Sequence, residues 1–187
     1  MDIDDTPVQS YFHEVVNKAL STVGLKLSHW SEFYIVDLLV RQASKAFDVN
    51  RPLVDLLMEV TSEPSPHRRF EVHQRLGDTA LFLAGFCVGY IRNRGLSLEY
   101  IKSMGRRGYT GASEYPLSPT PREVFEELSQ EFEGVALVYD EVREQTTVGT
   151  TADVVKLWEQ YRKTKSPAVK RRLYLNGVIL LDEDEEV

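Results

Sequence analysis

Asp78 is the residue of this 187-residue sequence whose type and setting point most directly to chemistry. It is the one carboxylate in the apolar run Leu76–Ile91, LGDTALFLAGFCVGYI, and arginines stand on both sides of that run. On a helix, Arg75 and Phe82 would share its face at spacings of i−3 and i+4. A buried ionised carboxylate needs a partner, because an uncompensated charge is destabilising by several kcal/mol. We therefore expect either a structural bridge from Asp78 to an arginine or tyrosine of another helix, or a carboxylate that lines a binding pocket.

Other polar side chains could meet Asp78 at such a pocket. Arg106 and Tyr109 are three residues apart in the next predicted helix, where both could reach Asp78 or an anionic ligand that they share. Arg92 adds a cation just after the apolar run. The candidate binding residues are therefore Arg75, Asp78, Arg92, Arg106 and Tyr109. We identify no catalytic residue.

The common catalytic and metal-binding motifs are absent from the sequence. It has no Glu-x-x-His pair of a di-iron bundle, no His-Glu-x-x-His zinc helix, no phosphate-binding glycine-lysine loop and no Gly-x-Ser-x-Gly elbow. The histidines are scattered, and the single cysteine, Cys87, lies in the apolar run, where we expect a packed and unreactive thiol. We therefore expect neither a metal nor another cofactor.

Charge is distributed unevenly along the chain. The net charge is −7, which argues against nucleic acid as the main partner. Residues 67–107 nevertheless carry 8 Lys and Arg against 3 Asp and Glu, an excess of +5. Two interpretations are open: these cations pair with acidic neighbours on other helices, or they form a surface for an anion or an acidic partner.

Prolines and glycines mark where the supporting helices begin and end. Hydroxyl–proline pairs, which suit the first residues of a helix, occur at Thr6-Pro7, Ser65-Pro66, Thr120-Pro121 and Ser166-Pro167. Gly24 and Gly95 are typical helix terminators. With the apolar periodicity they predict helices over residues 7–23, 29–47, 52–60, 66–93, 96–109, 121–142, 154–161 and 167–175, with a loop over 111–119. No strand pattern appears, so we predict an all-α, single-domain bundle of seven or eight helices around a central buried helix, Pro66–Asn93.

Two of these helices have unusual surfaces. Helix 29–47 has apolar residues on most sides, Trp30 and Phe33 included, and only a narrow polar stripe, so we expect it to be largely buried.

The central helix contains glycines, each unfavourable in a helix interior by about 1 kcal/mol relative to alanine. We attribute them to the close approach of a neighbouring helix, with a cofactor against the bare backbone as the alternative.

An apolar seam runs along helix 121–142. Its residues recur at spacings of 3 and 4 and are Phe125, Leu128, Phe132, Val135, Tyr139 and Val142. Such a seam demands a helical partner, either in the same chain or in a second subunit. We expect it to pack inside the bundle, because a chain of this size needs each amphipathic helix to close its own core.

The remaining expectations concern domains and location. We assign residues 1–181 to one helical domain and 182–187 to an acidic C-terminal tail. No segment reaches the length of a transmembrane helix, and the acidic N-terminus lacks the features of a secretory signal. We therefore expect a cytoplasmic protein without a membrane partner.

Part of the sequence resembles a known group of proteins. The run 75–86 (RLGDTALFLAGF), then Arg92, then 100–105 (YIKSMG) and Tyr109, is similar to a pattern in uncharacterised bacterial proteins of about this size. The resemblance implies an all-helical fold and a bacterial cytosolic origin. It covers less than a fifth of the chain and implies no activity, cofactor or site residue.

Three functions remain open. The leading hypothesis is a non-catalytic binding or interaction protein, with a protein partner, a second copy of the chain or an anionic small molecule as its ligand. The second is a small-molecule or cofactor-dependent enzyme with a site at Arg75, Asp78, Arg106 and Tyr109. The third is a nucleic-acid-associated regulator that uses residues 92–107. A solid core favours the first hypothesis, a large enclosed pocket at Asp78 the second, and a continuous basic face on a protruding helix the third.

Overall fold

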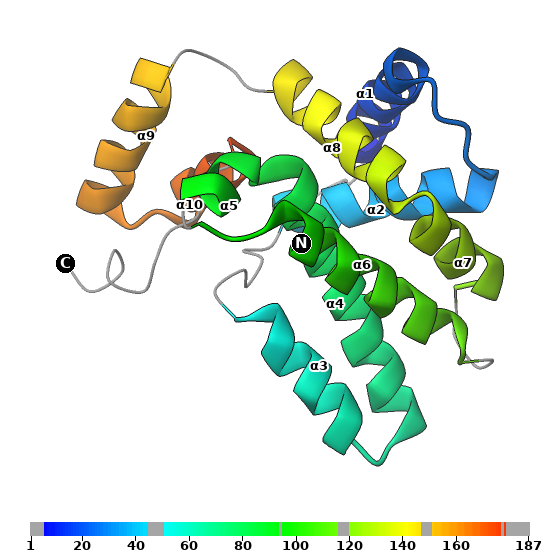
Figure 1. Cartoon of the computed structure of the whole chain (residues 1–187). Coiled ribbons are helices and arrows are strands. Elements are labelled where there is room, and N and C mark those ends of the chain that lie inside the picture. The colour runs from blue at the N-terminus through cyan, green and yellow to red at the C-terminus, as the bar shows by residue number, and fades with distance from the viewer. Residues whose placement is uncertain are drawn as a thin grey trace.

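The structure, a computed structural model, describes residues 6–44, 51–93, 95–115, 120–146, 151–176 and 178 (Figure 1). The described residues form helices joined by short connections and contain no strand, so the all-α prediction is confirmed. The helices are α1 (Thr6–Val23), α2 (His29–Ser44), α3 (Leu53–Ser62), α4 (Pro66–Phe86), α5 (Val88–Asn93), α6 (Leu98–Ser113), α7 (Arg122–Gln130), α8 (Phe132–Thr146), α9 (Thr151–Thr164) and α10 (Pro167–Leu175). The described part of the chain contains no helix with the length and apolar character that crossing a membrane requires.

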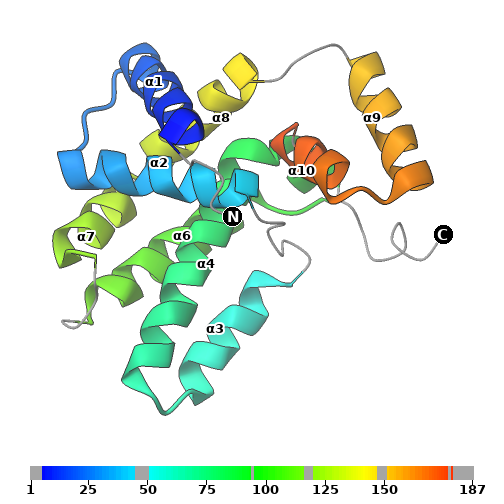
Figure 2. The same cartoon turned by 180° about the vertical axis from the view of Figure 1, so that it is seen from behind.

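Helix α4 is the centre of the bundle. Helix α6 packs along it, and α3 and α8 also contact it. Seen from behind, α2 crosses the upper part of α4 (Figure 2), where their side chains are hydrogen-bonded. One hydrophobic core joins α1 to α8. Helices α9 and α10 enclose a smaller apolar cluster of their own, and α10 contacts α2.

Local sequence signals set many helix boundaries. Gly24 and Gly95 follow helix ends with left-handed φ angles of +76° and +65°, a conformation that glycine adopts without steric strain. Pro66 and Pro167 are the first residues of α4 and α10, as predicted. Ser28 caps α2, because its carbonyl accepts from the Glu32 amide and its hydroxyl from the Ser31 amide. The predicted tail, residues 182–187, lies outside the described residues.

Two predicted helices are each divided in two. The helix predicted over 66–93 leaves the α conformation at Cys87 and resumes as α5, and the break lies between Gly85 and Gly89, two residues that weaken a helix. The helix predicted over 121–142 breaks at Glu131, which separates α7 from α8. Periodicity did not reveal either break, because each leaves the apolar faces on both sides directed into the same core.

Helix α6 is longer than predicted. We expected residues 96–109 to be helical and 111–119 to be a loop, but α6 continues through Gly105, Gly108 and Gly111 to Ser113. A Cβ atom on any of these glycines would collide with a neighbouring helix, and one on Gly108 would lie 2.9 Å from the Cα atom of Gly77. The glycines therefore allow α6 to approach α4 closely. The same holds for Gly77, where a Cβ atom would collide with the Tyr109 ring, and for Gly85, where it would collide with Tyr139 of α8. The packing explanation is therefore confirmed for these two glycines of the central helix, whereas a Cβ atom on Gly89 would meet no atom within 4 Å.

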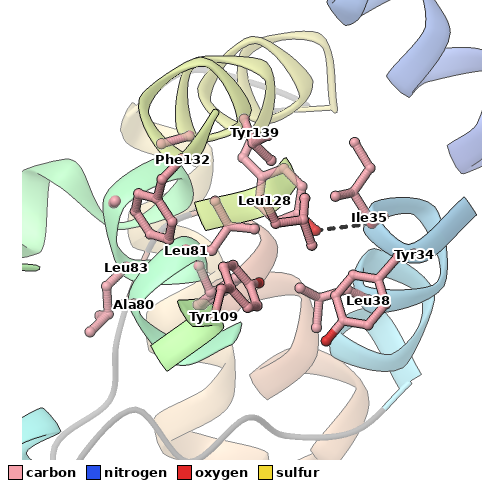
Figure 3. Packing of buried hydrophobic residues seen from close by; sticks show 14 of the residues in the cluster. Tyr34, Ile35, Leu38, Ala80, Leu81, Leu83, Tyr109, Leu128, Phe132 and Tyr139 are labelled. Atoms are coloured by element: carbon pink, nitrogen blue, oxygen red, sulfur yellow. Dashed lines mark hydrogen bonds between the residues drawn. The ribbon is translucent and has the colours of Figure 1, made fainter. Parts of the chain in front are cut away.

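The apolar seam packs inside the chain. All six of its side chains are buried in the main core, in agreement with the prediction. The Phe125 ring contacts the rings of Tyr34 and Tyr109, and the Tyr139 hydroxyl donates to the Ile35 carbonyl at 2.9 Å (Figure 3). Helices α7 and α8 are thereby joined to α2.

Candidate functional site

Asp78 lies in the middle of α4 and is 4% exposed. Its Oδ1 atom accepts two hydrogen bonds, from the Tyr34 hydroxyl at 2.8 Å and from the Tyr109 hydroxyl at 3.0 Å. The two tyrosines approach from α2 and α6, and their hydroxyl groups extend towards the space between these helices (Figure 3). One carboxylate oxygen therefore joins three helices through buried hydrogen bonds.

The second oxygen of Asp78 faces an arginine. The Oδ2 atom lies 3.7 Å from a terminal nitrogen of Arg41, and the Nε atom of Arg41 lies 2.8 Å from Asp37. The Arg41 guanidinium also sits 5.8 Å from the centre of the Tyr34 ring, and Gln74 donates to the Tyr34 hydroxyl at 2.9 Å. The predicted bridge from Asp78 to an arginine or tyrosine of another helix is therefore present, with both kinds of partner.

Burial determines the protonation of this cluster. It raises the pKa of Asp78 to about 6, while the Arg41 charge and the two tyrosine hydrogen bonds act in the opposite direction. Burial, followed by the nearby Asp78 charge, also raises the pKa values of Tyr34 and Tyr109 well above the ordinary tyrosine value. The tyrosines therefore remain protonated donors at neutral pH, and Asp78 serves as their acceptor.

Two pockets lie beside this cluster. The first, which we call the polar pocket, has a volume of about 220 Å³ and is lined by Arg41, Glu71, Gln74, Arg75 and Asp78. The second, the aromatic pocket, also has about 220 Å³ and is lined by Trp30, Phe33, Tyr34, Asp37, Arg41, Gln74, Thr120, Pro121 and Val124. Arg41 and Gln74 line both pockets, so the two pockets adjoin, and we call them together the α2–α4 groove.

The structure brings together three of the five candidate residues. Arg75 and Asp78 line the polar pocket, and Tyr109 is bonded to Asp78 from the core side. Arg106 lines neither pocket, and its guanidinium forms an ion pair with Glu133 of α8. Arg92 is exposed on α5 and also lies outside both pockets.

Sequence reasoning missed the contribution of α2 to the site. We expected helix 29–47 to be buried on most sides, but Trp30 is 61% exposed and Phe33 is 49% exposed. Together with Asp37 and Arg41 they follow spacings of 3, 4 and 4, which place them along one face of the helix. That spacing was the available signal. It identifies a shared face but not whether another helix covers it.

The other sequence candidates are structural or dispersed. Cys87 is buried, which raises the pKa of its thiol to about 12, as expected for an inert packed thiol. Within the described ranges, no group of three or more metal-ligating side chains could hold an ion. Some cations of the basic middle segment pair with nearby acids, Lys102 with Glu99 at 3.0 Å among them.

The chain matches no protein-family model, no curated protein and no solved structure. Its function is therefore inferred from the α2–α4 groove and the cluster beneath it.

Proposed function

We propose that this protein is a non-catalytic binding protein whose ligand site is the α2–α4 groove. The observation that carries the proposal is the exposure of Trp30 and Phe33 at the aromatic pocket, directly beside a buried and hydrogen-bonded polar cluster. Large aromatic side chains that stand in a concave surface are typical of ligand sites, because a ligand that covers them removes apolar area from water.

The character of the cluster supports binding over catalysis. Asp78 is held by two tyrosines, which suits a rigid support for the groove. Among the described residues, no histidine, cysteine or lysine lines either pocket. Both pockets are open to solvent, and the core beneath them is filled by fully buried side chains such as Leu81 and Tyr109. A solid core below an open groove is the arrangement that favours a binding protein.

One observation favours an enzyme as the second candidate. Asp78 lines the polar pocket with a pKa of about 6, and a carboxyl group that titrates near neutrality suits general acid–base chemistry. This candidate predicts that a compound bound by the wild-type protein changes mass during incubation and that Asp78→Asn abolishes the change. The binding proposal predicts that the compound is recovered unaltered from both proteins.

Native mass spectrometry of the purified protein tests the proposal. We expect a population that carries one additional small mass, and this mass should be lost in the double variant Trp30→Ala/Phe33→Ala. The matched control is Leu137→Ala, because Leu137 is also a large exposed apolar residue but lies on α8 and lines neither pocket. The same spectra report the number of subunits. The proposal is wrong if no mass is retained and a screen of diverse small molecules finds none whose binding depends on Trp30 and Phe33.

We also propose a bacterial cytoplasmic protein without nucleic-acid or membrane partners. The resemblance of residues 75–109 to uncharacterised bacterial proteins supports the origin, and the net charge of −7 supports the exclusion of nucleic acid. Any affinity for duplex DNA should be weak and should vanish by about 200 mM salt, because it would rest on phosphate contacts alone. Submicromolar binding that persists at that salt concentration in a gel-shift titration would instead support the nucleic-acid regulator.

A further inference from the structure

We infer that the α2–α4 groove binds an amphipathic carboxylate, with the anionic head against Arg75 in the polar pocket and the apolar body over Trp30 and Phe33 in the aromatic pocket. This inference rests on the proposed function and names its ligand class. It assigns Arg75 as the anion receptor, and Trp30 and Phe33 as the residues that recognise the apolar body.

The charges that line the polar pocket are unequally matched. Arg41 is engaged by two carboxylates, Asp37 at 2.8 Å and Asp78 at 3.7 Å. Arg75 lines the same pocket, and in the described part of the chain no carboxylate lies within ion-pair distance of it. Glu71, one turn before Arg75, lies instead 3.4 Å from a nitrogen of His67. In the described part of the chain, Arg75 and Glu71 are thus the two charges of this pocket that no permanently charged side chain matches, because His67 is charged only when protonated. The group open to an anion is the exposed guanidinium of Arg75.

A carboxylate is the chemical group that best complements this position. The planar guanidinium presents parallel N–H donors that match the two oxygens of a carboxylate, and such charge-assisted pairs are stronger than neutral hydrogen bonds. The Gln74 amide nitrogen donates one of its two N–H groups to Tyr34, so the other can assist an anion. Arg75 supplies the charge that recognises the anion, and Arg41 lies beside it where the two pockets adjoin.

The dimensions of the groove indicate a small molecule. Each pocket has about 220 Å³, and their combined volume falls near the lower end of the roughly 300–1,000 Å³ that is usual for small-molecule sites. Pro121 and Val124 line the aromatic pocket together with Trp30 and Phe33, so an acyl chain or a single ring can lie against apolar side chains. Because Arg41 and Gln74 line both pockets, a ligand that occupies both pockets must lie over these two side chains.

Trp30 provides a direct optical signal for this ligand. The chain has two tryptophans, and Trp158→Phe leaves Trp30 as the single indole emitter. In this background we would titrate octanoate, octanamide and octylamine, which share the same chain length and differ in head-group charge. We expect octanoate to shift the Trp30 emission and to bind about tenfold or more tightly than octanamide. Each methylene added between hexanoate and decanoate should strengthen binding about threefold to fourfold, because the chain lies in the apolar part of the groove.

Charge variants test the role of Arg75. Arg75→Gln should lower the affinity for octanoate to that for octanamide and leave octanamide binding unchanged. Glu71→Gln should raise the affinity for octanoate, because it removes a negative charge from the same pocket. The matched control is Arg107→Gln, since Arg107 is an exposed arginine of α6 that lines neither pocket.

The outcomes separate the ligand class from the binding function. Tighter binding of octylamine or octanamide than of octanoate would overturn the carboxylate assignment and leave the groove as a binding site. An unchanged octanoate affinity in Arg75→Gln would overturn the role of Arg75. If none of the three probes moves the Trp30 emission while native mass spectrometry shows a retained compound that depends on Trp30 and Phe33, the ligand class is wrong and the proposed function stands.

Discussion

Asp78→Asn removes a buried negative charge but keeps an oxygen that can accept the hydrogen bonds of Tyr34 and Tyr109. Burial raises the pKa of Asp78 from the ordinary value of 3.8 to about 6. By linkage, this difference corresponds to about 3 kcal/mol of folding free energy. Because the pKa is higher in the folded state, protonation of Asp78 favours the folded protein. This contribution to the free energy of unfolding is present below about pH 4 and is lost as the pH rises through 6.

The comparison of two variants isolates this effect. Relative to wild type, Asp78→Asn should gain about 2 kcal/mol between pH 4 and pH 7, and at pH 7 it should be at least as stable as wild type. Asp78→Ala also removes the charge but leaves two buried tyrosine hydroxyls without their acceptor, at about 1–3 kcal/mol each. The relieved burial of charge offsets only part of these losses, and we expect Asp78→Ala to be destabilised by about 1–4 kcal/mol at pH 7.

Urea unfolding followed by circular dichroism at several pH values measures both differences. The difference between Asp78→Asn and wild type is the decisive quantity, because other carboxylates contribute equally to both proteins. A difference that stays constant from pH 4 to pH 7 would show that Asp78 does not carry a raised pKa. Equal stabilities of Asp78→Ala and Asp78→Asn would show that the tyrosine hydrogen bonds contribute nothing measurable.

Three further perturbations test the fold around the site. Phe132→Asp should unfold the protein or destabilise it by several kcal/mol, because Phe132 is fully buried, whereas Leu137→Asp on the exposed side of α8 should leave the thermal melting curve almost unchanged. Gly108→Ala should lower stability by about 2 kcal/mol or more in the same assay, because the added methyl group would collide with the backbone of α4. The control is Gly89→Ala, whose methyl group would meet no atom within 4 Å and which should gain up to about 1 kcal/mol. Glu127→Ala should lose about 1 kcal/mol of stability in urea unfolding, because the Glu127 carboxylate accepts hydrogen bonds from the amide and hydroxyl of Ser28, which caps α2. Unchanged stability would show that these hydrogen bonds do not stabilise the start of α2.

Much of the helical architecture could be predicted because helix boundaries depend on neighbours in the sequence. Pro66 begins α4 and Gly24 ends α1 through steric and hydrogen-bonding effects that act within a few residues. The breaks at Cys87 and Glu131 could not be predicted in the same way. Each depends on how the helices on its two sides pack against the rest of the core, and apolar spacing alone does not encode that packing.

For the site, the sequence by itself determined that Asp78 is buried in an apolar helix and that it needs a partner, because an isolated buried charge is strongly unfavourable. Only the tertiary structure decided that the partners are Tyr34, Tyr109 and Arg41, and that Trp30 stands exposed at a pocket rather than in the core. The physical reason is that the charge and hydropathy of a residue indicate whether it needs a hydrogen-bond or ion-pair partner but do not identify that partner. The crossing of α2 over α4 decides which side chains, distant in the sequence, are close enough to provide it.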